Sequence, residues 1–205
     1  VPAPWVQAHG HAQLLGWVGA FIIGISLYML PKLRSGRLRS PAAGWLMWAL
    51  WSGAIALRWS TGIFEAGWQW AWPAAAGMEL LVALLLIWQT WPPGAPARFQ
   101  LRDWLIEAGF LGLLLTMLVQ AQAVWPPPQA PVVPAGINNR MLHLAVWAFC
   151  YPVVWGYSAH FLPTLLGLGR PSSRLACIAL GLLAAGLPFP WLLPASVLAA
   201  CWTLR

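Results

Sequence analysis

Six long apolar runs, separated by short polar connections, occupy most of the chain, and a seventh apolar run ends it. A helix needs about 20 apolar residues to cross the hydrocarbon core of a membrane. The pattern therefore predicts an all-α fold, a polytopic transmembrane helical bundle with six complete spans. The seventh run has about 15 residues, which is short for a crossing, and we interpret it as cut off or as a tilted terminal helix. The expected spans are residues 11–30, 42–59, 70–91, 104–125, 140–162 and 173–187, and the terminal run is 191–205.

Helix-breaking and helix-capping residues mark the ends of these spans. Pro31 ends the first span before a basic connection, and Ser60-Thr61-Gly62 is expected to break the second. Asp103 is placed to cap the start of the fourth span. The Pro-rich stretch 126–134 then predicts an extended linker, which leads to an expected helix N-cap at Asn138-Asn139.

The chain repeats part of its first span. The stretch that begins at His143 matches the stretch that begins at His11, at a constant offset of 132 residues. This offset encloses four expected spans, so the fifth span starts a second four-span unit. We therefore divide the chain into residues 1–134, the first repeat with its outer linker, and residues 135–205, the start of the second repeat. The matched pairs are His11/His143, Gly24/Gly156, Ser26/Ser158, Leu30/Leu162, Pro31/Pro163 and Leu33/Leu165.

The composition is typical of a membrane protein. Hydrophobic residues make up 60% of the 205 residues and charged residues only 7%, whereas soluble domains carry about 25% charged residues. The net charge of +7 lies mainly in the short connections, which indicates topology signals and no nucleic-acid partner. With the N-terminus outside, only Arg58 and Arg140 lie toward the outer side, so the positive-inside rule favours this orientation. The nine cations then expected in the cytoplasm are Lys32, Arg34, Arg37, Arg39, Arg98, Arg102, Arg170, Arg174 and Arg205.

The four histidines are the residues with the clearest ligand chemistry. Because His11 and His143 match in the two repeats, we expect them on neighbouring helices near the outer face, as the two axial ligands of one heme iron. His9, in the His9-Gly10-His11 motif at the mouth of the first span, is an additional candidate for a second heme, a copper ion or a propionate. His160 is a weaker metal-ligand candidate with a structural alternative. The alternative for all helix-end histidines is contact with interfacial water.

Two glutamates lie inside expected spans. Glu79 is at the middle of the third span, where a charge is costly unless it faces the protein interior. It either bonds within the bundle or takes part in a proton or ligand path. Glu107 is expected to pair with Arg102 or Arg98 at the inner end of the fourth span. The sequence contains no Cys-x-x-Cys-His motif, so any heme is expected to be bound noncovalently, as heme b.

The stretch from His9-Gly10-His11 to Tyr28-Met29-Leu30-Pro31 resembles the heme–copper oxidase superfamily in residue types and spacing. In that family a His-x-His binds two hemes, and four-helix repeats build a twelve-span fold, of which this chain would cover somewhat more than half. The segment from Trp155 to Leu168, taken with residues 9–31, is also similar to the NnrS family of membrane proteins, which contain heme and copper and are linked to nitric oxide stress. These resemblances imply a bacterial inner-membrane protein.

The departures from the oxidase pattern limit the expected function. Four histidines without a His-His pair cannot supply a complete dioxygen-reducing centre. The resemblance therefore implies a heme-binding protein, with or without copper, for electron transfer or nitric-oxide handling. Its expected partners are membrane lipids, other membrane subunits and a quinone or a periplasmic electron donor. The alternatives are a cofactor-free structural subunit of a respiratory or photosynthetic complex and a transporter with parallel repeats.

Overall fold

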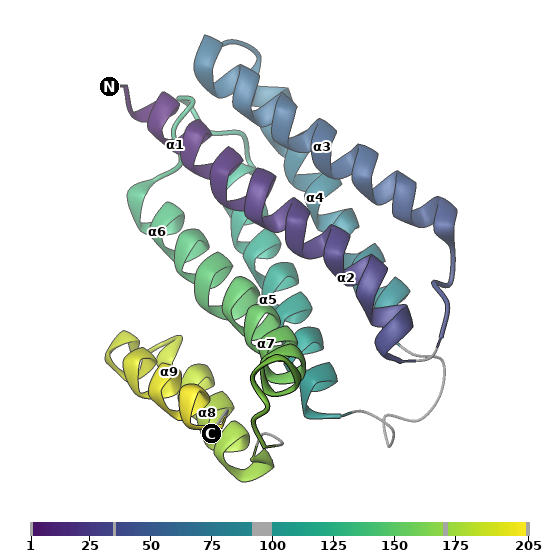
Figure 1. The fold of residues 1–205 in the computed structure, drawn as a ribbon. Coiled ribbons are helices and arrows are strands. Elements are labelled where there is room, and N and C mark those ends of the chain that lie inside the picture. Colours follow the sequence, from purple (N-terminus) through teal and green to yellow (C-terminus); the bar gives the residue numbers. More distant parts are fainter. Residues whose placement is uncertain (1, 35, 92–99, 170–171, 204–205) are drawn as a thin grey trace.

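The computed structural model describes residues 2–34, 36–91, 100–169 and 172–203, and every regular element in them is a helix. The first three elements, α1 (Ala3–His11), η1 (Ala12–Gly19) and α2 (Ala20–Leu33), form one continuous helix, which we call the N-terminal helix (Figure 1). Its η1 part is π-helical. The helix begins two turns before the predicted span, because Pro2 and Pro4 suit a helix start. The His-x-His motif therefore lies inside the helix and not at its mouth.

Three antiparallel helices follow and pack side by side in chain order: α3 (Pro41–Phe64), α4 (Trp68–Thr90) and α5 (Leu101–Val124). The predicted break at Ser60-Thr61-Gly62 is wrong, because α3 continues to Phe64. The hydroxyls of Ser60 and Thr61 donate to the Leu57 carbonyl within the helix. Gly62 instead allows a close approach, since a Cβ atom there would lie 2.9 Å from Ala8 Cβ.

The second long composite helix consists of α6 (Ala135–Leu144), η3 (Ala145–Cys150) and α7 (Tyr151–Leu166), and we call it the 135–166 helix. Its η3 part is also π-helical. The predicted N-cap at Asn138-Asn139 is wrong, because Pro134 precedes the helix and the asparagines lie within it. The predicted cap by Asp103 in α5 is confirmed, since its carboxylate accepts from the Gln100 backbone N–H at 2.9 Å.

The C-terminal part is a short helical hairpin of α8 (Ser173–Gly186), η4 (Pro190–Leu192) and α9 (Leu193–Trp202), drawn in yellow tones in Figure 1. At 14 residues, α8 is about 21 Å long, shorter than the hydrocarbon core of about 30 Å. The helices α8 and α9 are therefore shorter than the apolar runs 173–187 and 191–205 in which they lie. Arg98, Arg170 and Arg205 lie outside the described residues.

Two pairs of helix starts are separated by the offset of the sequence repeat. Ala3 and Ala135 each begin a helix directly after a proline, 132 residues apart. The next helices start at Pro41 and Ser173, again 132 residues apart, and Ser40 and Ser172 cap them with their hydroxyls. The π-helical segments follow His11 and His143 at nearly the same distance.

In the part of the chain that the structure describes, three helices are long and apolar enough to cross a membrane: Ala3–Leu33, Trp68–Thr90 and Arg102–Val124. Many large apolar side chains are exposed on the outer surface of the bundle, among them Trp17, Phe21 and Trp45. A soluble monomer rarely exposes so much contiguous apolar surface, so this surface supports a membrane environment. The interior is also apolar, and Leu15, Phe110 and Phe149 are among its fully buried side chains.

The closest backbone approach in the bundle is between α5 and η3. A Cβ atom built on Gly112 would lie 1.9 Å from the Ala148 carbonyl oxygen, and one on Gly109 would lie 2.9 Å from the Phe149 carbonyl oxygen. No side chain fits between these backbones. Gly112 and Gly109 therefore set the distance between α5 and the 135–166 helix.

We predict that Gly112→Ala destabilises the folded protein by more than about 3 kcal/mol, at the upper end of overpacking costs, because a backbone carbonyl cannot move aside as a side chain can. Denaturant unfolding in detergent measures this loss. Gly53→Ala in α3 is the matched control, because nothing lies within 4 Å of its Cβ position. The control should gain up to about 1 kcal/mol from helix propensity. Equal stability of both variants would contradict the close packing.

Candidate polar site within the helix bundle

Four polar side chains meet inside the bundle, and each comes from a different long helix. His11, Arg58, Glu79 and Gln120, which we call the His11 cluster, are at most 2% exposed. The His11 Nε2 atom lies 3.1 Å from Gln120 Oε1 and 3.4 Å from Glu79 Oε1. The Gln120 amide donates to Glu79 Oε2. The N-terminal helix, α3, α4 and α5 are thus joined at one level by a polar network.

The His11 cluster contains one full positive and one full negative charge. The Arg58 guanidinium lies 5.1 Å from the Trp72 ring centroid, and Trp72 donates its indole N–H to Thr61 Oγ1 at 3.2 Å. The Arg58 Nη1 and Glu79 Oε1 atoms are buried without a hydrogen-bond partner in the described residues. Buried polar atoms are nearly always paired, so these two atoms mark the cluster as a functional candidate.

The π-helical segment η1 begins directly after His11. Trp51 of α3 donates its indole N–H to the Leu15 carbonyl in this segment at 3.1 Å. Gly16 and Gly19 bring α3 close, since Cβ atoms there would lie 2.9 Å from Ile55 and 3.1 Å from Trp51. These two glycines therefore serve close helix packing. π-Helical turns are rare and often occur at functional sites.

The other three histidines lie in separate places. His9 is exposed on the opposite face of the N-terminal helix from His11 and stacks on Trp5, with ring centroids 5.0 Å apart. His143 is half-buried on α6, and its Nε2 atom is buried with no hydrogen-bond partner among the residues that the structure describes. His160, at the other end of the bundle, accepts a 2.7 Å hydrogen bond from Arg102 at Nδ1.

These positions test whether the residues fit a heme with His11 and His143 as its axial ligands. His143 fits, because it offers an imidazole nitrogen with no competing partner. His11 does not fit, because its Nε2 atom already contacts Glu79 and Gln120, and iron at that atom would leave both buried groups without it. No contact in the described residues brings His11 and His143 together. The described residues also contain no group of three or more His, Cys, Asp or Glu that could hold a metal ion.

A second polar network, the Arg34 cluster, lies at the other end of the same helices. Arg34 donates to Asp103 Oδ1 at 2.9 Å, to Glu107 Oε1 at 3.0 Å and to the Thr90 carbonyl at 2.6 Å. Glu107 therefore pairs with Arg34 and not with Arg102, and the other predicted partner, Arg98, lies outside the described residues. The chain turns after Leu33 and places Arg34 next to α5. The sequence does not predict this contact, because 69 and 73 positions separate Arg34 from Asp103 and Glu107. Each carboxylate oxygen of Asp103 and Glu107 accepts a hydrogen bond, so we interpret the Arg34 cluster as a structural contact that joins the helix ends.

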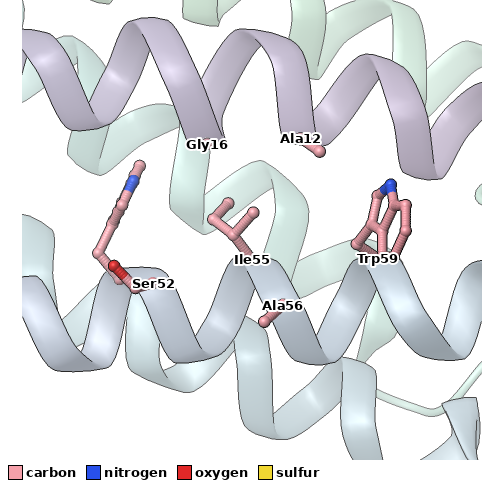
Figure 2. Close-up of a pocket in the computed structure, with 7 residues that line it drawn as sticks. Ala12, Gly16, Ser52, Ile55, Ala56 and Trp59 are labelled. Carbon is pink, nitrogen blue, oxygen red and sulfur yellow. The ribbon is translucent and has the colours of Figure 1, made fainter.

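An open groove lies between the N-terminal helix and α3, next to the His11 cluster. Its volume is about 360 Å³. Figure 2 shows Ile55 at its floor, Ser52 and Trp59 on either side of it, and Gly16 and Ala12 on the facing helix. Ala12, which lines the groove, directly follows His11 in the chain. Its lining is mainly apolar, which suits an acyl chain or a flat ring.

Sequence reasoning missed Arg58 and Gln120 as members of a site. Arg58 was expected at the outer side of the membrane, but it is 2% exposed inside the bundle. Both residues do carry a sequence signal, because each is an isolated polar residue in a long apolar run. Glu79 does bond within the bundle, as one of its two alternatives predicted.

Comparison with known proteins adds no relative: no family model, no curated protein and no solved structure matches this chain.

We predict that Glu79→Ala destabilises the protein by about 3–5 kcal/mol, because it leaves the Arg58 charge buried without its counter-charge. The double variant Arg58→Met/Glu79→Met removes both charges and should lose much less. Thermal unfolding in detergent compares the two. Arg140→Met, which removes an exposed cation from α6, serves as the control. Equal losses in the single and double variants would contradict the electrostatic attraction between Arg58 and Glu79.

We also predict that Arg34→Met costs about 3 kcal/mol or more, since Asp103 and Glu107 would keep buried charges without a cation. Arg37→Met removes an exposed arginine from the same connection and should stay within about 0.5 kcal/mol of the parent. The same unfolding assay measures both variants. A loss in Arg37→Met as large as that in Arg34→Met would show that stability depends on the number of positive charges and not on the contacts of Arg34 with Asp103 and Glu107.

Proposed function

We propose that this chain is a multi-pass protein of the bacterial inner membrane with six spans, four-span repeats and its N-terminus outside. The equal spacing of the helix starts and of the two π-helical segments supports the repeats. Three arginines lie at one end of the bundle, where Arg34 donates to the Thr90 carbonyl, Arg39 to the Trp91 carbonyl and Arg102 to the Leu33 carbonyl. Their clustering supports a cytoplasmic location for that end.

Within this membrane protein, the proposed function is noncovalent heme binding for electron transfer or nitric-oxide handling. The observation that carries it is the buried, unpartnered Nε2 atom of His143 on a helix that turns π-helical two residues later. A polar atom left unpaired in a membrane protein is costly and commonly functional. The resemblance to heme-containing membrane families also implies that heme is the ligand.

His143 would hold the group through Nε2, and a bound heme would supply one-electron redox chemistry or an iron that binds a gas. Trp147 lies one turn further along the same face, where its ring packs on Tyr151 at 5.7 Å between centroids. These rings would exclude water from the imidazole. His9 is the remaining candidate for copper, since its ring lies at the exposed surface beside Trp5.

The proposed electron donor is a membrane quinone or a periplasmic protein. The groove between the N-terminal helix and α3 supports a quinone, because it combines a mainly apolar lining with two tryptophans, Trp51 and Trp59. It lies at the surface that the exposed apolar side chains place against lipid.

A cofactor-free subunit of a larger membrane complex is the second candidate function. The observation that favours it is the exposed aromatic surface, with Trp17 71%, Trp45 72% and Trp48 64% exposed. Other membrane subunits could cover these rings as well as lipid does. In this case the polar clusters would serve only to join the helices.

We predict that the purified protein, supplied with heme during expression, shows the reduced-minus-oxidised bands of a b-type heme. His143→Ala should lose these bands, because the imidazole ligand is removed. Asn139→Ala, an exposed position one turn earlier on α6, should keep them. A folded parent protein without heme would overturn this function and favour the structural subunit.

A further inference from the structure

The two matched histidines point to different sides of their helices. His11 lies on the buried face of the N-terminal helix with Leu15 and Gly19, and this face meets α4 and α5 through Glu79 and Gln120. His143 is half-buried and lies two positions from the buried residues Met141 and Ala145, so it lies off the core face of the 135–166 helix. Further along this helix, the Tyr151 hydroxyl donates to the Ser196 carbonyl of α9 at 3.4 Å. This contact joins the 135–166 helix to the C-terminal hairpin.

A different face of the 135–166 helix meets the N-terminal helix. Ala145, Phe149 and Val153 belong to the shared core, and a Cβ atom on Gly19 would lie 3.8 Å from Phe149 Cε1. The two π-helical segments, η1 and η3, contact each other directly. This contact joins the core faces of the two helices, and His143 lies off the core face of its own helix.

The equal spacing of the helices explains this arrangement. If the two long composite helices are equivalent members of two repeats, equivalent side chains face the helices that follow them in their own unit. His11 faces α4 and α5, which follow the N-terminal helix. The 135–166 helix meets α8 and α9, which follow it, through Tyr151 and Trp155.

We infer that His11 and His143 belong to two separate sites and do not ligate one heme iron together. This inference rests on the proposed function for the identity of the ligand at His143. The His143 site takes the heme, and the His11 cluster stays intact when heme binds. One heme per chain therefore depends on His143 and not on His11.

The experiment compares heme content and visible spectra of the full chain, expressed with heme, in His143→Ala, His11→Ala and His11→Gln. The glutamine variant keeps a hydrogen-bonding side chain next to Gln120 and Glu79, so it tests ligation even if the alanine variant folds poorly. The expected result is that His143→Ala loses the heme, whereas His11→Gln keeps the parental heme content and band positions. Loss of heme in a folded His11→Gln variant would overturn the inference.

A second measurement does not depend on heme. Side chains that share a site change stability non-additively, whereas separate sites give additive changes. We expect the shift in Tm of His11→Gln/His143→Ala to equal the sum of the two single shifts. His11→Gln/Glu79→Gln is the positive control and should deviate from additivity, because these side chains are in contact. Non-additive shifts for His11 and His143 would overturn the inference, while an absence of heme in the parent would overturn the proposed function alone.

Discussion

The structure depends on placing charged groups inside an apolar bundle. Glu79 and Arg58 lose their water completely, and the desolvation cost is offset only if His11, Gln120 and Trp72 lie at the same level. This condition determines how four helices can slide past one another. The Arg34 cluster imposes the same condition at the other end of the helices.

Between the two polar clusters the core is mainly apolar, with Ser26 and Thr116 as buried polar residues. Glu79 and Thr90 are eleven positions apart on α4, or about 16 Å along the helix. Leu86, Leu113 and Met117 fill this interval without exposure. This distance leaves the two clusters without direct contact, so each cluster joins the helices at its own end of the bundle. Glu79 in the His11 cluster keeps a carboxylate oxygen without a hydrogen bond in the described residues, whereas the carboxylate oxygens of Asp103 and Glu107 all accept hydrogen bonds.

The two long composite helices combine a proline start, a histidine and a π-helical segment in the same order. A π-helical turn rotates the residues that follow it relative to a straight α-helix. This rotation lets η1 and η3 pack against each other while each histidine keeps a different neighbourhood. Similar sequence therefore leads to similar local structure but not to a shared site, which is why a matched pair of histidines need not be a pair of ligands.

The sequence by itself determined the all-α class, the approximate lengths of the apolar helices and most helix ends. Apolar runs and prolines favour or end a helix through local effects along the chain. It also indicated that Glu79 must bond inward, since a charge in lipid is too costly. Only the tertiary structure decided which partners these groups have. Glu107 pairs with Arg34 across 73 positions, and His11 meets Gln120 across 109. Such contacts depend on the relative height and rotation of packed helices, and these are set by close approaches such as that at Gly112 rather than by any local pattern.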